Sequence, residues 1–237
     1  MRLSNAVLAC AAASIWFGAS TGAAPADEAL RALIEGNARF VAGAPTNPNS
    51  GLERVSETAA GQHPFVTVLG CADSRAPVER IFDQGIGDVF VIRVAGNVAA
   101  VNEIGTAEYG TAHLGTPLIV VLGHTKCGAV SAVVEGAEVH GNIPALVSTI
   151  VPAVEATRAA HPDADNATLI PLAIHANVLQ SMEDILTHSE VIAGLIEQGQ
   201  VRMVGALYDI ATGEVVWIGE HPEQAALLEA AAAPAGH

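Results

Sequence analysis

Basic residues are scarce in this chain of 237 residues. Only 10 are Lys or Arg, against 25 Asp or Glu, which gives a formal net charge of −15. Nucleic acids and anionic membrane surfaces are bound through clustered basic residues, so this balance argues against both partners. The chain is nevertheless not a disordered acidic segment, because 51% of its residues are hydrophobic and its mean hydropathy is +0.40. That content is enough for a large core, and the length suits one globular domain.

The longest stretch without a charged residue lies at the N-terminus. Residues 3–20 follow Arg2 without a charged side chain, and Ala24-Pro25-Ala26 then fits an A-x-A cleavage site before Asp27. A transmembrane anchor is the competing interpretation, but a run of this length rich in Ala, Ser and Gly is marginal for spanning a bilayer. We expect residues 1–26 to be a signal peptide, residues 27–237 to be the mature domain, and the protein to be exported to a bacterial periplasm with no membrane attachment after cleavage.

Cysteine is also rare, with three in the whole sequence. Cys10 lies in the predicted signal peptide, where the stretch before it is short for a lipid-anchor signal. Cys71 and Cys127 therefore remain in the mature chain. Two cysteines in an exported protein ordinarily suggest one disulfide, so any other role must be argued from the residues around them.

Short apolar runs of strand character alternate with helical patterns along the mature chain. The predicted strands are residues 65–70, 88–94, 118–123, 201–208 and 215–218. The predicted helices are residues 27–41, with Asp27 as its cap, and residues 103–114, 129–135, 143–160 and 167–198, the last in one or two pieces. Near-continuous apolar strands between helices indicate a mostly parallel sheet covered on both faces. We therefore predict a single α/β domain with about four parallel strands and an antiparallel edge strand.

Two of the predicted strands end in the same manner. Residues 65–70 lead into Cys71-Ala72-Asp73-Ser74-Arg75, and residues 118–123 lead into His124-Thr125-Lys126-Cys127-Gly128. Loops at the carboxyl ends of parallel strands form the ligand crevice of such sheets. Two thiolates and one imidazole make a tetrahedral zinc site with one position open, as catalytic zinc requires. A disulfide between Cys71 and Cys127 remains geometrically possible.

Asp73 and Arg75 stand beside the first of these cysteines. An Arg fork can hold a carboxylate at two points and keep it ionised. Such a carboxylate could accept a hydrogen bond from a zinc-bound hydroxide, or it could move onto the metal as an alternative ligand. A structural salt bridge at a helix start is the plainer alternative. A nucleotide site is not expected, because no Gly-rich phosphate-binding loop follows the first strand.

At these motifs the chain resembles the beta-class carbonic anhydrases, from about Ala29 to Trp217. The matching segments, in order, are Gly36-Asn37-Ala38-Arg39-Phe40-Val41, Gly61-Gln62-His63-Pro64, Cys71-Ala72-Asp73-Ser74-Arg75-Ala76-Pro77, Ile81-Phe82-Asp83-Gln84-Gly85, Val91-Ile92-Arg93-Val94-Ala95-Gly96-Asn97, Glu108-Tyr109-Gly110, His124-Thr125-Lys126-Cys127-Gly128 and Val204-Gly205-Ala206-Leu207-Tyr208-Asp209.

The resemblance implies reversible hydration of carbon dioxide to bicarbonate and a proton by a zinc-bound hydroxide. Cys71, His124 and Cys127 would ligate one zinc per chain, and Asp73 with Arg75 would form the catalytic dyad. It also implies a homodimer or dimer of dimers, with the N-terminal helix packing on a partner subunit. The residues implied in binding carbon dioxide or bicarbonate are Gln62, Phe90, Ala95, Tyr109 and Gly128. Part of this pocket would be supplied by the partner.

Some members of the family have a bicarbonate-inhibited state that depends on a Trp three residues before the first zinc cysteine. This chain has Val68 there, so it resembles the members without that regulation. Two alternatives remain open: a carbon disulfide or carbonyl sulfide hydrolase on the same fold, and a non-catalytic zinc-binding protein. The presence of Asp73, Arg75 and Gln62 argues against the second, because a purely structural zinc site needs none of them.

Overall fold

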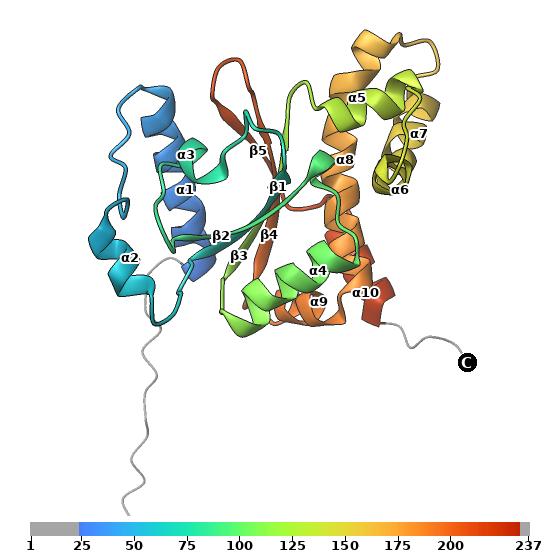
Figure 1. The fold of residues 1–237 in the computed structure, drawn as a ribbon. Coiled ribbons are helices and arrows are strands. Elements are labelled where there is room, and N and C mark those ends of the chain that lie inside the picture. The colour runs from blue at the N-terminus through green and yellow to red at the C-terminus, as the bar shows by residue number, and fades with distance from the viewer. Residues whose placement is uncertain (1–23, 233–237) are drawn as a thin grey trace, which may run out of the picture.

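A five-stranded sheet organises the protein, as the computed structural model of residues 24–232 shows (Figure 1). Its strands lie in the order β2-β1-β3-β4-β5. They are β1 Val66–Cys71, β2 Val89–Val94, β3 Leu118–His124, β4 Arg202–Tyr208 and β5 Val215–Gly219. The first four are mutually parallel and β5 pairs antiparallel with β4. The predicted fold class is therefore confirmed, whereas residues 1–23 of the predicted signal peptide lie outside the described residues.

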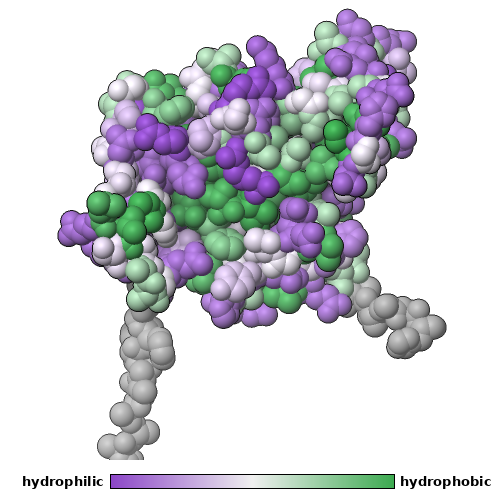
Figure 2. Space-filling view, in the orientation of Figure 1, coloured by the Kyte–Doolittle hydropathy of each residue, from purple (hydrophilic) through white to green (hydrophobic). Residues whose placement is uncertain are grey.

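The burial of each strand follows from its place in the sheet. All residues of β1 and β3 are buried, because both strands are flanked by neighbours and covered on both faces. Their sequences are accordingly apolar at nearly every position rather than alternating. Strand β2 forms one edge, and most of its side chains are only half-buried. On this side of the molecule hydrophobic side chains gather over the middle of the sheet (Figure 2).

One face of the sheet is covered by helices α1 (Pro25–Val41) and α3 (Val78–Ile81). Leu33 of α1 and Phe82, just after α3, are fully buried in the core on this side. Helix α1 thus packs on its own sheet. Ile34 on the same helix remains 44% exposed. The contact of α1 with a partner subunit stays a prediction. Helix α2 (Leu52–Thr58) was not predicted; it has no buried residue.

The predicted start of the first helix was wrong by two residues. Helix α1 begins at Pro25 after Ala24, and the Asp27 N–H already donates to the Ala24 carbonyl at 2.9 Å. Proline fits the first turn of a helix because its missing N–H would have no helical partner there. Asp27 therefore lies inside the first turn, where its carboxylate accepts from Arg202 Nη1 at 2.9 Å instead of capping.

The other face carries α4 (Val101–Glu108), α8 (Asn166–His188), α9 (Glu190–Glu197) and α10 (Gln224–Ala232). Met182, Ile185 and Leu186 of α8 are fully buried in the core that these helices share with the sheet. The helix predicted over residues 167–198 is two helices, α8 and α9. The Ser189 hydroxyl accepts from the Ile192 N–H and so caps the start of α9. Among residues 24–232 no helix has the length and apolar character needed to cross a bilayer.

Three further predicted helices also differ in detail from the observed ones. Predicted residues 143–160 form α6 (Ile143–Val147), a 3-10 turn and α7 (Val151–Ala160), with a proline near the start of each helix. The helix predicted over residues 103–114 is α-helical only as far as Glu108, the end of α4, and continues as a π-helical turn, Tyr109–His113. Helix α5 (Gly128–Glu135) starts one residue earlier than predicted.

Candidate metal centre and active site

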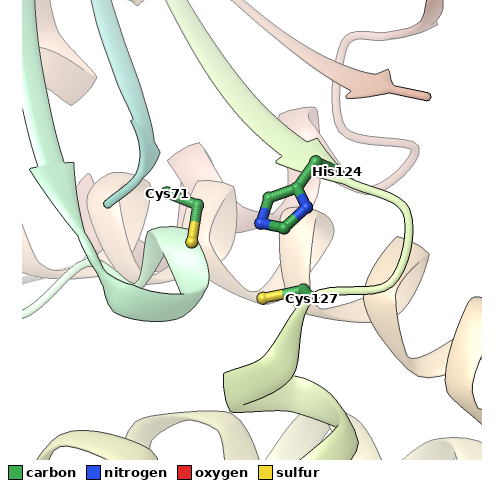
Figure 3. A group of neighbouring side chains, drawn as sticks. All are labelled: Cys71, His124 and Cys127. Atoms are coloured by element: carbon green, nitrogen blue, oxygen red, sulfur yellow. The ribbon is translucent and has the colours of Figure 1, made fainter. Parts of the chain in front are cut away.

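Strand adjacency brings the two predicted loops together. β1 and β3 are neighbours in the sheet, with Gly70 opposite Leu122, so Cys71 and His124 end adjacent strands at the same edge. Cys127 follows after a tight turn in which Lys126 has φ 55°. The three side chains point toward one another (Figure 3), and their ligand atoms all lie within 4.8 Å of one another.

His124 is held in the tautomer that a metal requires. Its Nδ1 lies 2.9 Å from the Thr125 carbonyl. Because a carbonyl can only accept, Nδ1 must carry the hydrogen, and the lone pair of the neutral ring is then on Nε2. That nitrogen is buried and has no hydrogen-bond partner among the described residues. An acceptor on one ring nitrogen and a free lone pair on the other are what metal-binding histidines show.

The environment of Cys71 favours a thiolate. Contact with Cys127, helped by His124 and by the backbone N–H groups of Gly96 and Asp73, holds the pKa of Cys71 below its ordinary value. Those N–H groups donate to the sulfur from 3.3 Å and 3.4 Å respectively. Contact with the Cys71 sulfur and burial raise the pKa of Cys127, because two adjacent thiolates repel each other when no cation lies between them. A divalent cation would remove that repulsion.

These three residues fit a zinc ion by their chemistry. Both thiols are free, and all three side chains are buried. Zinc binds Cys sulfur at about 2.3 Å and His nitrogen at about 2.0–2.1 Å, so a compact buried cluster of this kind is suitable. Burial by itself lowers the pKa of His124, but the nearby Cys71 sulfur, the hydrogen bond to the Thr125 carbonyl and the charge of Asp73 outweigh it, so the net shift is upward. A proton on Nε2 would compete with the metal, so metal affinity should fall in acid.

Asp73 lies beside the cluster and is held by Arg75. Arg75 donates from Nε to Oδ1 at 2.9 Å and from Nη2 to Oδ2 at 2.7 Å, and its own N–H donates to Oδ1 at 2.9 Å. These bonds hold the pKa of Asp73 well below its usual range. Oδ2 also lies 3.8 Å from His124 Nε2. The carboxylate is therefore ionised, oriented and adjacent to the open side of the metal cluster.

Arg93 on β2 fixes the loop that carries these residues. Its Nε donates to the Cys71 carbonyl at 3.0 Å and its Nη2 to the Asp73 carbonyl at 2.7 Å. The motif containing Arg93 was recognised in the sequence, but this role was not predicted. A single charged residue in an otherwise apolar strand was the available signal.

Comparisons with known proteins agree with this site. The sequence model of the family described as carbonic anhydrase matches residues 66–215. The chain is 38% identical over 192 residues to carbonic anhydrase 2 of Mycobacterium tuberculosis, covering 79% of this chain and 90% of that protein. The chain belongs to the beta-carbonic anhydrase family.

Solved beta-carbonic anhydrases share its fold. CafA of Aspergillus fumigatus superposes with a TM-score of 0.69 at 24% identity, over 85% of this chain and 96% of that one. A tetrameric beta-carbonic anhydrase of Sordaria macrospora gives 0.62 at 25% identity, over 81% and 98%.

The other residues predicted for this beta-carbonic anhydrase site lie in four places. Phe90 on β2 and Tyr109 in the π-helical turn stack with their ring centroids 5.9 Å apart. Ala95 opens the 3-10 turn Ala95–Asn97 that follows β2. Gly128 is the exposed first residue of α5, next to Cys127. Gln62 is exposed before β1, and no hydrogen bond joins it to another side chain within residues 24–232. Their roles in substrate binding stay predictions.

Proposed function

We propose that this beta-carbonic anhydrase hydrates carbon dioxide reversibly, using one zinc ion held by Cys71, His124 and Cys127. The observation that carries the proposal is the oriented Asp73 carboxylate beside a buried cluster of two cysteines and one histidine. A purely structural zinc site would have no use for a carboxylate fixed at that distance. Such a zinc supplies a nucleophile at neutral pH by lowering the pKa of water from 15.7 to about 7.

The chain's own residues orient the reactants. Asp73 can only accept hydrogen bonds while it is ionised, so it would fix the direction of the attacking water's hydrogen. The positive charge of Arg75 keeps that carboxylate ionised and fixes its orientation. Arg75 also donates from Nη2 to the Lys126 carbonyl at 3.3 Å, which links the two metal-binding loops. Phe90 and Tyr109 would present an apolar wall to carbon dioxide, and Gln62 would donate to bicarbonate.

The decisive experiment is stopped-flow carbon dioxide hydration, with zinc counted on the same protein sample. Fast hydration with about one zinc per chain, lost in Cys71→Ala, is the expected result. One zinc per chain without hydration would overturn the proposal. The sulfur-substrate hydrolase is not favoured, because the curated relatives are named carbonic anhydrases; carbon disulfide turnover should be assayed in parallel as its test.

We also propose that the protein works as a homodimer or a dimer of dimers. Exposed apolar side chains in the segments before and after edge strand β2 support this, since Val101 is 82% exposed, Tyr109 47% and Ile86 40%, and apolar surface exposed in one subunit is often covered in an oligomer. The Sordaria relative is itself described as tetrameric. Sedimentation equilibrium would test the assembly, and a monomer at micromolar concentration would contradict it.

Export to the periplasm is proposed from the charge-free run and the A-x-A site alone. N-terminal sequencing of the protein recovered from a periplasmic fraction should give Asp27 as the first residue. Recovery of an intact Met1 terminus from the cytoplasm would contradict the proposal.

A further inference from the structure

The sulfur of Cys71 depends on a turn that belongs to neither metal-binding loop. The N–H of Gly96, in the turn Ala95–Asn97, donates to Cys71 Sγ at 3.3 Å. This donor comes from the end of β2, 25 residues along the chain from the cysteine. Hydrogen bonds to a coordinating sulfur orient it and moderate how much charge it gives the metal. The conformation of this turn is therefore part of the metal site.

The turn adopts an unusual and closely packed backbone conformation. Gly96 has φ 79° and Asn97 has φ 46°, so two successive residues are left-handed. A Cβ at position 96 would lie 2.7 Å from Ile150 Cδ1, so the turn is also closely packed. Gly and Asn are among the residues that adopt left-handed backbone most readily, so the sequence permits this turn. A contact from outside the turn then fixes where its carbonyl and N–H groups point.

That contact comes from helix α8. Asn177 Nδ2 donates to the Gly96 carbonyl at 2.7 Å, and Asn177 is only 1% exposed. Its Oδ1 has no hydrogen-bond partner among the described residues. A buried amide with one end unpaired costs free energy, and the surrounding positions of this helix face are mostly apolar. An aliphatic side chain would satisfy the packing, so the amide is best explained by its bond to Gly96.

The helix is pressed directly against the site. A Cβ on Gly123, the residue before His124, would lie 2.6 Å from Val178 Cγ2 and 3.7 Å from Asn97 Oδ1. Helix α8, the end of β3 and the turn after β2 thus meet at one point. Asn177 has little freedom to move there, so its bond holds the Gly96 carbonyl in one direction.

We propose that Asn177 is a positioning residue of the metal centre: by holding the Gly96 carbonyl it directs the Gly96 N–H at the sulfur of Cys71. Among the described residues no hydrogen bond joins the Asn177 side chain to Cys71, His124 or Cys127, and it acts through the turn. The inference rests on the metal site of the proposed function. Its test is therefore metal binding itself, which can be measured without any carbon dioxide hydration.

The experiment compares two variants of the whole protein loaded with Co²⁺. Asn177→Leu removes the donor and keeps a side chain of similar size. Ser181→Ala is the matched control, because Ser181 is equally buried one turn further along α8 and, within residues 24–232, its hydroxyl donates to the Asn177 backbone carbonyl alone. The readouts are the sulfur-to-cobalt charge-transfer absorption and the affinity for Co²⁺ in competition with a chelator. The unfolding midpoints of the metal-free proteins are measured alongside.

Asn177→Leu should weaken metal binding by about 10–100-fold and shift the charge-transfer band, as loss of an outer hydrogen bond does at other metal sites. Ser181→Ala should bind within about twofold of the original protein, which is the range expected for a site not coupled to the metal. Equal effects of the two variants, or an unchanged band in Asn177→Leu, would overturn the inference. If Asn177→Leu does not fold, Asn177→Ala adds no bulk beside Val178 and serves in its place. Failure of the original protein to bind Co²⁺ or Zn²⁺ would instead overturn the metal site.

Discussion

Replacing Asp73 by asparagine isolates the charge of this side chain from its shape. In the present geometry both carboxylate oxygens accept from Arg75, at 2.9 Å and 2.7 Å. Asparagine keeps one acceptor and presents an NH₂ group at the other position, where it would face a guanidinium N–H that also donates. The amide would therefore rotate or shift, and an ionised acceptor near His124 Nε2 would be lost.

The expected loss of activity is large. Positioned proton acceptors contribute about 10²–10⁴-fold to rate, which corresponds to about 2.7–5.4 kcal/mol in the activation barrier. We expect kcat/KM for carbon dioxide hydration to fall within that range in Asp73→Asn. Stability should change little, because Arg75 is about half exposed and exposed pairs contribute little. Zinc content should stay unchanged, since Asp73 is outside the set of three ligands.

The pH dependence of the rates tests whether Asp73 acts by orienting the attacking water or by changing its own protonation state. Arg75 keeps the pKa of Asp73 well below its usual range, so the carboxylate stays ionised throughout the neutral region. The ratio of original to variant rates should accordingly be constant between about pH 6 and 9. Stopped-flow rates, zinc content and thermal unfolding are measured together. The control is Glu220→Gln, which alters another carboxylate paired with an arginine, since Glu220, just after β5, accepts from Arg202 of β4 at 2.8 Å. A zinc-loaded Asp73→Asn enzyme with nearly full activity would refute the proposed role.

Three other predictions follow from the structure. Asp83 is buried, and although burial raises its pKa, hydrogen bonds from Arg39, Thr46 and Asn47 lower it overall. Asp83→Asn should therefore reduce the free energy of unfolding by about 3 kcal/mol at neutral pH. Urea titrations should show that difference narrowing below about pH 4, where the unfolded carboxyl group is protonated but the folded one is not; a difference independent of pH would count against the assignment. Chelation followed by air oxidation should join Cys71 to Cys127 and inactivate the enzyme until reductant and zinc are both added, and full recovery with zinc alone would disprove this. With Val68 in place of Trp, activity should decline smoothly from alkaline to neutral pH, and a steep cooperative loss in the pH–rate profile would show that the bicarbonate-inhibited state is present.

The ligand set was predictable because local sequence and sheet topology determine it together. Both metal-binding loops follow fully buried, largely apolar strands, and once those strands are neighbours, Cys71 and His124 must meet at one edge. The spacing from His124 to Cys127 is local and is readable directly. Strand positions were likewise recovered to within one residue at every end, because buried parallel strands are continuous apolar runs.

Contacts between distant segments were not predictable in the same way. The Asn177 bond to Gly96 spans 81 residues and the Arg93 contacts with the first loop span about 20. No periodicity or spacing reveals which turn a buried asparagine will reach. Helix α3 was missed because only four residues form it, which is too short for an apolar period to be visible. The start of α1 was misplaced because an acidic residue suited to capping follows a proline suited to the first turn.

The metal ligands come from two separate strand–loop–helix units, at the ends of β1 and β3. This arrangement makes the stability of the folded protein depend on zinc. A metal that binds only when both units are assembled acts as a removable cross-link, and it shifts the folding equilibrium by mass action. Free zinc at 1,000 times its dissociation constant would add about 4.1 kcal/mol to stability. The abundance of the folded protein should thus report the zinc supply of its compartment, because zinc-starved molecules would unfold and be degraded sooner.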